Sequence, residues 1–448
     1  MRSLSFAGIA LLLAACGAAA QVAPAPSSTP PTSSQTVVTL TLADAIARAK
    51  SNSPQFQAAL AQLGMAREDR VQARSALLPN VSYLSSFIYT QGNGPPQGNV
   101  PSTGVYIANN GVHEYISQGV AHEAFGFASL PAYQRAKGAQ ALAKAKAEIA
   151  TRGLVVTVVQ AFYGLLAAQE KTKSTAQASG EAEHFLDIGK KLEVGGEVAH
   201  SDVIKAQIQA NDLQRQLEDA KLAEENARLA MAVLVFPNFF QDFTLVNDLA
   251  AAPALPALPD IQEMAKNNNP ELQAAFAALA VADKEVAVAR AGHLPSLTVD
   301  WFYGIDANQF AIYNRDGLRN LGYSAVASLN IPVFSWGATQ SKVRQAELQS
   351  HQAQVELSAA QRRALADLQS FYSEAQTVRG QLDILRSSSE LAAESLRLTN
   401  LRYQAGEATA LEVVDAQNTL TAARNGYHDG EARYRLAIAN LQTLTGAF

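Results

Sequence analysis

The segment GHLPSLTVDWFYGID, residues 292–306, joins two kinds of structure in one chain. It follows an Ala-rich, charged run that is typical of a helix, and Pro295 marks the end of that run because the residue before a proline avoids the helical region. From here large apolar side chains occupy every second position; they are Leu297, Val299, Trp301, Tyr303 and Ile305. This alternation predicts a strand with one strongly apolar face.

A second alternating segment lies at residues 321–331, and its apolar set begins with Leu321 and Tyr323. Weaker alternation covers residues 81–90 and 113–125. Strands of about ten residues with one apolar face are typical of membrane β-barrels. A half-buried hairpin on a soluble core gives the same pattern, so the strands alone leave both interpretations open.

The chain contains the same order of elements twice. Residues 51–79 align without gaps with residues 267–295, and 12 of the 29 positions are identical. Further matches occur at offsets of 209 and 210, between residues 160–207 and residues 369–417. We therefore predict a duplicated domain, with a first repeat at 40–248, an Ala/Pro linker at 249–259 and a second repeat at 260–448.

Each repeat reads as helix, strand, strand, long helix, turn and helix. The long helical runs, at 131–192 and 337–403, each span over 60 residues, or roughly 90–100 Å. Shorter helices are predicted at about 201–235 and 409–444. The fold class is therefore mainly α with a small β part. Helices of this length do not fit a compact globule, which favours the membrane interpretation of the strands.

One stretch has a local preference that conflicts with its repeat partner. LVVTVVQAF, residues 154–162, is rich in β-branched side chains and favours a strand by propensity. Its partner at 364–371 is helical in composition. Because the two repeats share one order of elements, we predict helix for both.

The first residues are typical of an export signal. Arg2 precedes an apolar core that is too short to span a bilayer. Two processing sites are compatible with the sequence: cleavage after Ala20, with a signal peptide of residues 1–20, or lipid attachment to Cys16, with a signal of residues 1–15. The mass of the mature protein distinguishes them. Residues 21–39, rich in Pro, Ser and Thr, predict a flexible linker.

No later segment has about 18 uninterrupted apolar residues, so we predict no transmembrane helix. A membrane-spanning form then requires a closed barrel, because only helices and closed barrels satisfy the backbone in lipid. Four strands do not close a barrel, and about eight is the practical minimum. Three copies supply twelve strands and leave room for a water-filled lumen. A conduit therefore favours a trimer, whose long helices would form a tube.

Other functions find no support in the sequence. The net charge of −5 without basic blocks argues against a nucleic-acid surface. The seven histidines are scattered, and the chain has no Gly-rich phosphate loop, nucleophile elbow or zinc motif. We therefore expect no enzymatic activity, no metal site and no cofactor.

The chain resembles the TolC-like outer membrane efflux protein family across nearly all of the mature sequence. The resemblance rests on the duplicated NxP…LP blocks, on LNIPVFSWG (329–337) and on YQAGEATALEVVDAQNTL (403–420). It implies a homotrimer with a twelve-strand β-barrel in outer-membrane lipid and a long periplasmic α-helical barrel. It also implies docking to a periplasmic adaptor protein and an inner-membrane transporter, in a tripartite efflux or type I secretion system with a passive, gated outer-membrane channel.

The resemblance also implies a periplasmic aperture at the second helical tip. Tyr403 stands at the position of the family's linking tyrosine, and Asp202 at that of its aspartate partner. Glu412 and Asp415 fall on the positions of the constricting carboxylates. Where the family has an arginine in its closing network, this chain has Ala408. We therefore expect the network to be weaker or differently built.

Residue types at the tips agree with that assignment. Glycines at the predicted turns permit the positive φ of a helix end; they are Gly195, Gly196 and Gly406. Glu412 and Asp415 are three residues apart and share one helix face. In a trimer they would form a ring that favours cations. Solvated acids near a helix N-terminus would show the same spacing.

A different class of function shares several of these features. A periplasmic coiled-coil adaptor or scaffold without a membrane barrel would also have an export signal and long helical hairpins. It would not need strands with alternating aromatic residues between its helices. Lysine substitutions on the apolar strand face distinguish the two functions.

Overall fold

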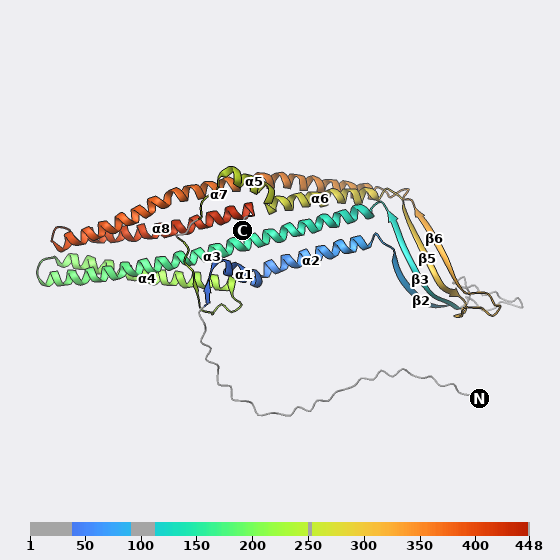
Figure 1. Cartoon of the computed structure of the whole chain (residues 1–448), viewed down its shortest axis with the longest axis horizontal. Helices are drawn as coiled ribbons and strands as arrows, with labels where there is room; N and C mark the ends of the chain where they lie inside the picture. Colours follow the sequence, from blue (N-terminus) through green and yellow to red (C-terminus); the bar gives the residue numbers. More distant parts are fainter. Residues whose placement is uncertain (1–37, 91–112, 250–252, 447–448) are drawn as a thin grey trace, which may run out of the picture.

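The computed structural model of the chain describes residues 38–90, 113–249 and 253–446. The helices run along one axis of an elongated molecule, and the strands continue from one end of it (Figure 1). The helices are α1 (Leu42–Asn52), α2 (Pro54–Ser75), α3 (Ser129–Val194), α4 (His200–Val235), α5 (Leu258–Asn268), α6 (Pro270–Ala291), α7 (Ala338–Gln404) and α8 (Ala410–Thr445). The strands are β1 (Val38–Leu40), β2 (Asn80–Tyr89), β3 (His113–Gly126), β4 (Phe243–Leu245), β5 (Ser296–Ala307) and β6 (Leu321–Asn330).

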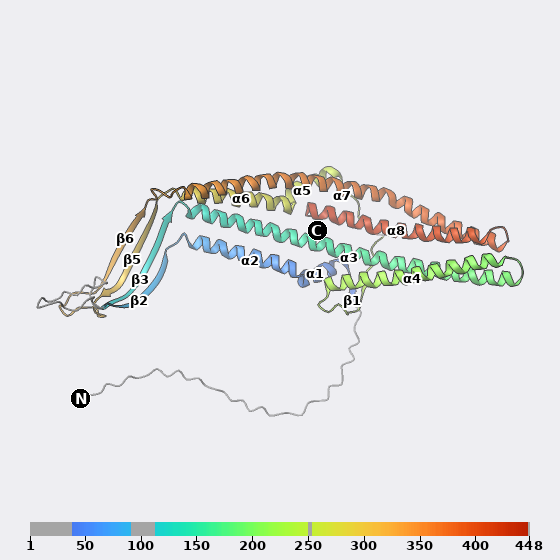
Figure 2. The ribbon, with the colours of Figure 1, turned by 180° about the vertical axis from the view of Figure 1, so that it is seen from behind.

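Two continuous helices, α3 with 66 residues and α7 with 67, form the long axis of the molecule. α3 packs against α2 near the strands and against α4 near the opposite end, while α7 packs in the same way against α6 and α8 (Figures 1 and 2). α3 also contacts α6 and α8, which joins the two repeats side by side. The predicted long helices and their shorter partners are confirmed, with ends within about two residues.

Local sequence signals fix where the shorter helices begin. At α1, Thr41 and Asp44 form a capping box. α2 and α6 each begin with a proline at the first helical position, after Ser53 and Asn269, whose side chains accept hydrogen bonds from the first-turn backbone. A capping side chain followed by a proline therefore begins the corresponding helix in both repeats.

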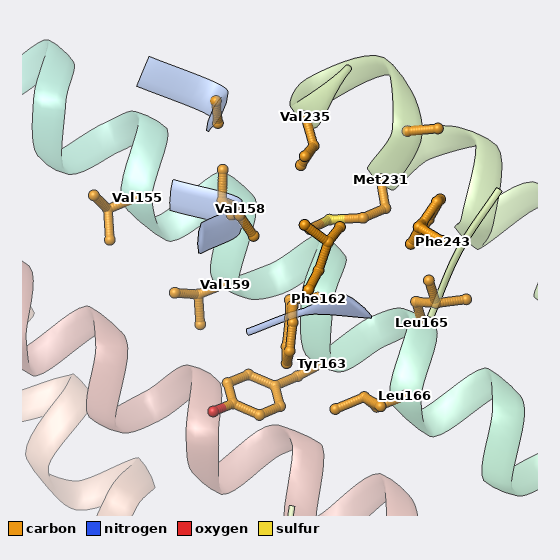
Figure 3. Close-up of a cluster of buried hydrophobic side chains, with 14 of the residues drawn as sticks. Val155, Val158, Val159, Phe162, Tyr163, Leu165, Leu166, Met231, Val235 and Phe243 are labelled. Atoms are coloured by element: carbon orange, nitrogen blue, oxygen red, sulfur yellow. The ribbon is translucent and has the colours of Figure 1, made fainter. Parts of the chain in front are cut away.

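The β-branched stretch at 154–162 is helical, as its repeat partner predicted. Its apolar side chains are in the largest buried cluster, where Val158, Val159 and Phe162 pack with Met231 of α4 and Phe243 of β4 (Figure 3). Among the described residues α3 is the one helix with a window apolar enough to cross a membrane, at a mean hydropathy of 1.5. Packing in this core accounts for that composition.

A short parallel pair of strands, absent from the sequence prediction, lies beside this core. β1 pairs with β4, and Leu40 is completely buried. The predicted first linker therefore ends too late, because Val38 and Thr39 are in β1. The predicted second linker also extends too far, since α5 begins at Leu258. The β-branched Val38 favours the strand β1. Pro259, at the second position of α5, favours the start of that helix.

The other four strands form one antiparallel sheet in the order β2-β3-β5-β6. Directly paired residues lie on the same face of such a sheet. Trp301 pairs with Ala325 and Tyr303 with Tyr323, so the apolar sets of β5 and β6 share one face. The opposite face is mostly polar and carries a 2.6 Å contact between His122 Nδ1 and Asp300 Oδ1. Within the described residues, β2 and β6 each lack a partner on their outer edge.

Candidate functional site

The end of the molecule farthest from the sheet consists of two helix reversals. α3 turns into α4 after Val194, and α7 turns into α8 after Gln404. Gly196 and Gly406 both adopt a φ of 75°, which only glycine takes at low cost. The prediction for Gly195 is wrong in this respect, since its φ is −73° and it closes α3 in right-handed geometry. One glycine with positive φ is enough to reverse each helix.

Tyr403 joins the two hairpins at this tip. Its side chain comes from α7 and is only 7% exposed. The ring lies 4.8 Å from the ring of Phe185 on α3, measured between centroids. Burial raises the pKa of the Tyr403 hydroxyl, and the nearby charge of Asp202 raises it further. The tyrosine expected to link the hairpins therefore links them mainly through packing.

Asp202, the expected partner of Tyr403, is at the start of α4 and bonds elsewhere. Its carboxylate accepts a hydrogen bond of 3.1 Å from Lys205 Nζ. Within the described residues no hydrogen bond joins Asp202 to the Tyr403 hydroxyl. The two residues lie near enough for an electrostatic effect, but the bond implied by the resemblance is absent from this structure.

Glu412 is held in the first turn of α8. Its Oε1 accepts hydrogen bonds of 3.1 Å from both the backbone N and the Oγ1 of Thr409, which completes a capping box. Its Oε2 lies 3.3 Å from Nη1 of Arg402 on α7. The pKa of the Glu412 carboxyl is lowered, first by the backbone bond from Thr409, then by the hydroxyl, and also by Arg402. This carboxylate therefore closes the turn between α7 and α8.

Asp415 differs from Glu412, although both are on one helix. Its side chain is exposed, and in the described part of the chain it has no hydrogen bond or ion pair. Its charge is therefore available to the solvent or to other copies of the chain. Of the two carboxylates predicted for the constriction, Asp415 is the one with a free charge.

At the turn that contains Ala408, the arginine contacts come from Arg402, which the sequence reasoning overlooked. Arg402 reaches across the turn, where Nη2 donates to the backbone oxygen of Glu407 at 3.1 Å and Nη1 contacts Glu412. Ala408 packs instead beside the apolar cluster around Tyr403. The Thr409-x-x-Glu412 spacing could have indicated the capping box. The position of Arg402 gave no comparable signal.

Two further contacts between the hairpins lie above the tip and were also missed. Gln209 Nε2 on α4 donates to Asn418 Oδ1 on α8 at 2.8 Å. Arg424 Nη1 on α8 donates to Gln177 Oε1 on α3 at 3.3 Å. Since each pair is separated by over 200 residues in the chain, no local pattern identifies it. The hairpins are thus joined by an aromatic contact at the tip and polar contacts above it.

Acidification should loosen the tip through Glu412. Because its pKa is lowered in the folded state, the stabilisation is present above its ordinary value of 4.5 and is lost as the pH falls through the folded value. We expect faster hydrogen exchange of the 405–413 amides below about pH 4, after correction for intrinsic rates. Glu412→Gln should remove this response.

The first turn of α4 is the internal control for that measurement, because Ala199 caps it without a side-chain hydrogen bond. Its acidic contacts, such as Asp202 with Lys205, are independent of Glu412, so its acid response should be the same in the wild type and in Glu412→Gln. If Glu412→Gln keeps the full acid response, the capping carboxylate is not its source.

The seven strand residues predicted to face the membrane lie together on one face of the sheet. Leu297, Val299, Trp301, Tyr303 and Ile305 alternate along β5, and their neighbours Leu321 and Tyr323 are opposite Ile305 and Tyr303. Trp301 is 49% exposed and Tyr323 is 78% exposed. Such large apolar side chains on an open face indicate a surface that is covered by something other than this chain.

No candidate metal centre accompanies these features in residues 38–90, 113–249 and 253–446. That part of the chain has no group of three or more His, Cys, Asp or Glu side chains placed to hold a metal ion. Cys16, the predicted lipid anchor, lies outside the described residues together with the predicted signal. The tip and the apolar sheet face are therefore the two candidate functional surfaces.

Comparison with known proteins gives consistent matches. Residues 261–447 match the family model described as "Outer membrane efflux protein". The chain is 25% identical to the outer membrane protein TolC of Vibrio cholerae serotype O1, over 90% of each chain. It is 24% identical to the alkaline protease secretion protein AprF of Pseudomonas aeruginosa, over 91% of this chain and 84% of that protein.

A solved structure matches the fold at similar coverage. The outer membrane protein VceC of Vibrio cholerae superimposes with a TM-score of 0.77 at 18% identity, over 90% of this chain and 96% of VceC. At that identity the likeness concerns the fold. The arrangement of long helices and one four-stranded sheet is therefore shared with a known outer-membrane protein.

Proposed function

The chain belongs to the outer membrane efflux protein family as a TolC-like member, and from this we propose that it is the passive outer-membrane channel of an export system. The observation that carries the proposal is the four-stranded sheet, with one apolar face, one polar face and two unpaired edges. Such a sheet fits a segment of a membrane barrel and does not fit a soluble core. The protein is in the outer membrane, with its helices in the periplasm.

Three protomers close the barrel in this proposal. Each supplies four strands, and pairing β6 of one copy with β2 of the next removes every free edge. Twelve strands enclose a lumen wider than an eight-stranded barrel, whose interior fills with side chains. The polar face with His122 and Asp300 then lines the water-filled side.

The helices continue the conduit into the periplasm. α7, with 67 residues, is about 100 Å long. We propose that the helical tips dock to a periplasmic adaptor and an inner-membrane transporter, which supplies the energy. The closure of the tips acts as the gate: Tyr403 holds the hairpins together, Glu412 closes the turn, and Asp415 directs its charge to the opening.

The ring of Asp415 side chains should set ion selectivity. Three unpaired carboxylates around one axis attract cations and repel anions. We expect Asp415→Asn to shift the cation-to-anion permeability ratio toward one in planar bilayers. The matched control is Asp429→Asn, an exposed acid four helical turns farther from the tip. Equal shifts in the two variants would place the selectivity ring elsewhere.

The function is tested on the purified protein in detergent. The mature chain should be extracted only with detergent, run as a trimer by light scattering and conduct ions in planar bilayers. Deletion of the gene should also abolish export by the partner transporter. A monodisperse monomer that stays in solution without detergent is incompatible with a membrane channel and would support the scaffold alternative.

A further inference from the structure

The loop between β5 and β6, residues 308–320, is built by specific hydrogen bonds. Asn314 Oδ1 accepts from the backbone N of Asp316 at 2.9 Å and of Leu318 at 2.8 Å. Asn314 N donates in turn to Leu318 O, and Gly317 adopts a φ of 78°. Tyr313 pairs with Arg319 as an antiparallel bridge. The loop therefore presents its side chains from a defined turn.

Large apolar side chains are exposed on this loop. They are Phe310 at 65%, Ile312 at 52%, Tyr313 at 60% and Leu318 at 67% exposure. A turn that is only hydrated does not require four such groups. Their exposure indicates a partner that is at least partly apolar.

The loop continues the apolar face of the sheet. Phe310 lies 6.1 Å from Tyr115 between ring centroids, and Tyr115 lies 4.8 Å from Phe87. Tyr115 pairs with Ala307, two residues beyond Ile305 on β5, so it is on the face that carries Trp301. Aromatic side chains at the loop end of this face are typical of the membrane–water boundary. The loop thus lies where an outer-leaflet headgroup would be.

Two arginines lie on the same loop. Arg315 and Arg319 are exposed, and neither side chain has a hydrogen bond or ion pair within the residues that the structure describes. Arg319 lies two residues before Leu321, the first residue of β6, and so is close in the chain to the apolar side chains of that strand. Asp316 reduces the charge of the turn but leaves it positive. Guanidinium groups bind phosphate oxygens in pairs and suit this geometry better than lysine.

We propose that the β5–β6 loop binds a phosphorylated lipid of the outer leaflet, with Arg315 and Arg319 on its phosphates and Phe310 and Leu318 against its acyl chains. The proposal rests on the proposed function, which places this loop at the outer surface. Two features select a lipid over a soluble anion: the apolar residues beside the cations, and the continuity with the lipid-facing strands. A bound lipid of this kind would fix the depth of the barrel in the membrane.

The test uses the detergent-solubilised trimer and diphosphoryl lipid A, followed by native mass spectrometry. We expect Arg315→Gln with Arg319→Gln to weaken lipid binding by roughly 25-fold, at about fivefold for each cation. Dephosphorylated lipid A should bind the wild type as weakly as diphosphoryl lipid A binds the variant. The matched control is Arg362→Gln with Arg363→Gln, two exposed arginines on α7, which should leave binding unchanged.

Two results would overturn the lipid site. One is equal binding of lipid A by the wild type and the loop variant. The other is full competition by millimolar inorganic phosphate, which would reduce the loop to a general anion site. Trimer mass and bilayer conductance are measured on the same samples. If the trimer conducts ions and its lipid binding does not depend on the two arginines, only the lipid site is contradicted. If no trimer forms, the proposed channel itself is contradicted.

Discussion

Trp301→Lys combined with Tyr323→Lys is expected to abolish assembly in the outer membrane. Trp301 is near the middle of β5, where a lysine facing lipid costs about 2–4 kcal/mol. Tyr323 is nearer the loop end of β6, where the cost falls to about 1 kcal/mol. Three copies multiply the penalty in a trimer. The measurement is the amount of trimer in outer-membrane fractions, which should fall below detection.

The control places the same charges on the other face of the same strands. Thr298 pairs with Ser328, and Ser324 pairs with Phe302, so both are on the polar face. Thr298→Lys with Ser324→Lys should assemble normally and reduce cation conductance. If both double variants assemble equally well, the face that carries Trp301 does not contact lipid. Equal assembly of the two double variants is the result expected of a periplasmic scaffold.

Tyr403→Ala should open the channel at its periplasmic end. Removing a large buried aromatic costs about 3–5 kcal/mol in a packed core, and Tyr403 is a buried member of the tip cluster, with 7% of its surface exposed. That loss removes the ring contact with Phe185 that joins α7 to α3. We expect higher mean conductance in planar bilayers and faster hydrogen exchange at the ends of α3 and α7.

Tyr403→Phe separates packing from hydrogen bonding. The structure has no hydrogen bond to the Tyr403 hydroxyl among the described residues, so the phenylalanine variant should conduct like the wild type. The resemblance to the family suggested a bond with Asp202. If Tyr403→Phe opens the channel as much as Tyr403→Ala, the hydroxyl is the lock and the closed state differs from this structure.

The sequence predicted the fold well where a punctuating residue or a repeat defined an element. Prolines at 54 and 270 begin matching helices, and α8 was predicted at 409–444 and found at Ala410–Thr445. The repeat also corrected the propensity of 154–162, whose valines are buried by tertiary packing. Agreement between two copies of one pattern is stronger evidence than either copy alone.

Features set by tertiary contacts could not be predicted. β1 and β4 have three residues each, too few for a period to show, and they pair across about 200 residues. The contact of Gln209 with Asn418 depends on how two hairpins align. The resemblance suggested Tyr403 and Glu412 as aperture residues, and that role stays a prediction. Only the three-dimensional structure shows that Tyr403 packs against Phe185 and that Glu412 is held by Thr409 and Arg402.

The unpaired outer edges of β2 and β6 have a consequence for biogenesis. A single copy in the periplasm exposes two strand edges without hydrogen-bond partners and one apolar sheet face. It cannot cover either of them without other copies of the chain. Folding of the sheet is then coupled to trimer assembly, and the rate of assembly depends on the concentration of protomers. Slow recruitment should appear as proteolysis and aggregation of single copies, so escort by a holding chaperone becomes a requirement of the architecture.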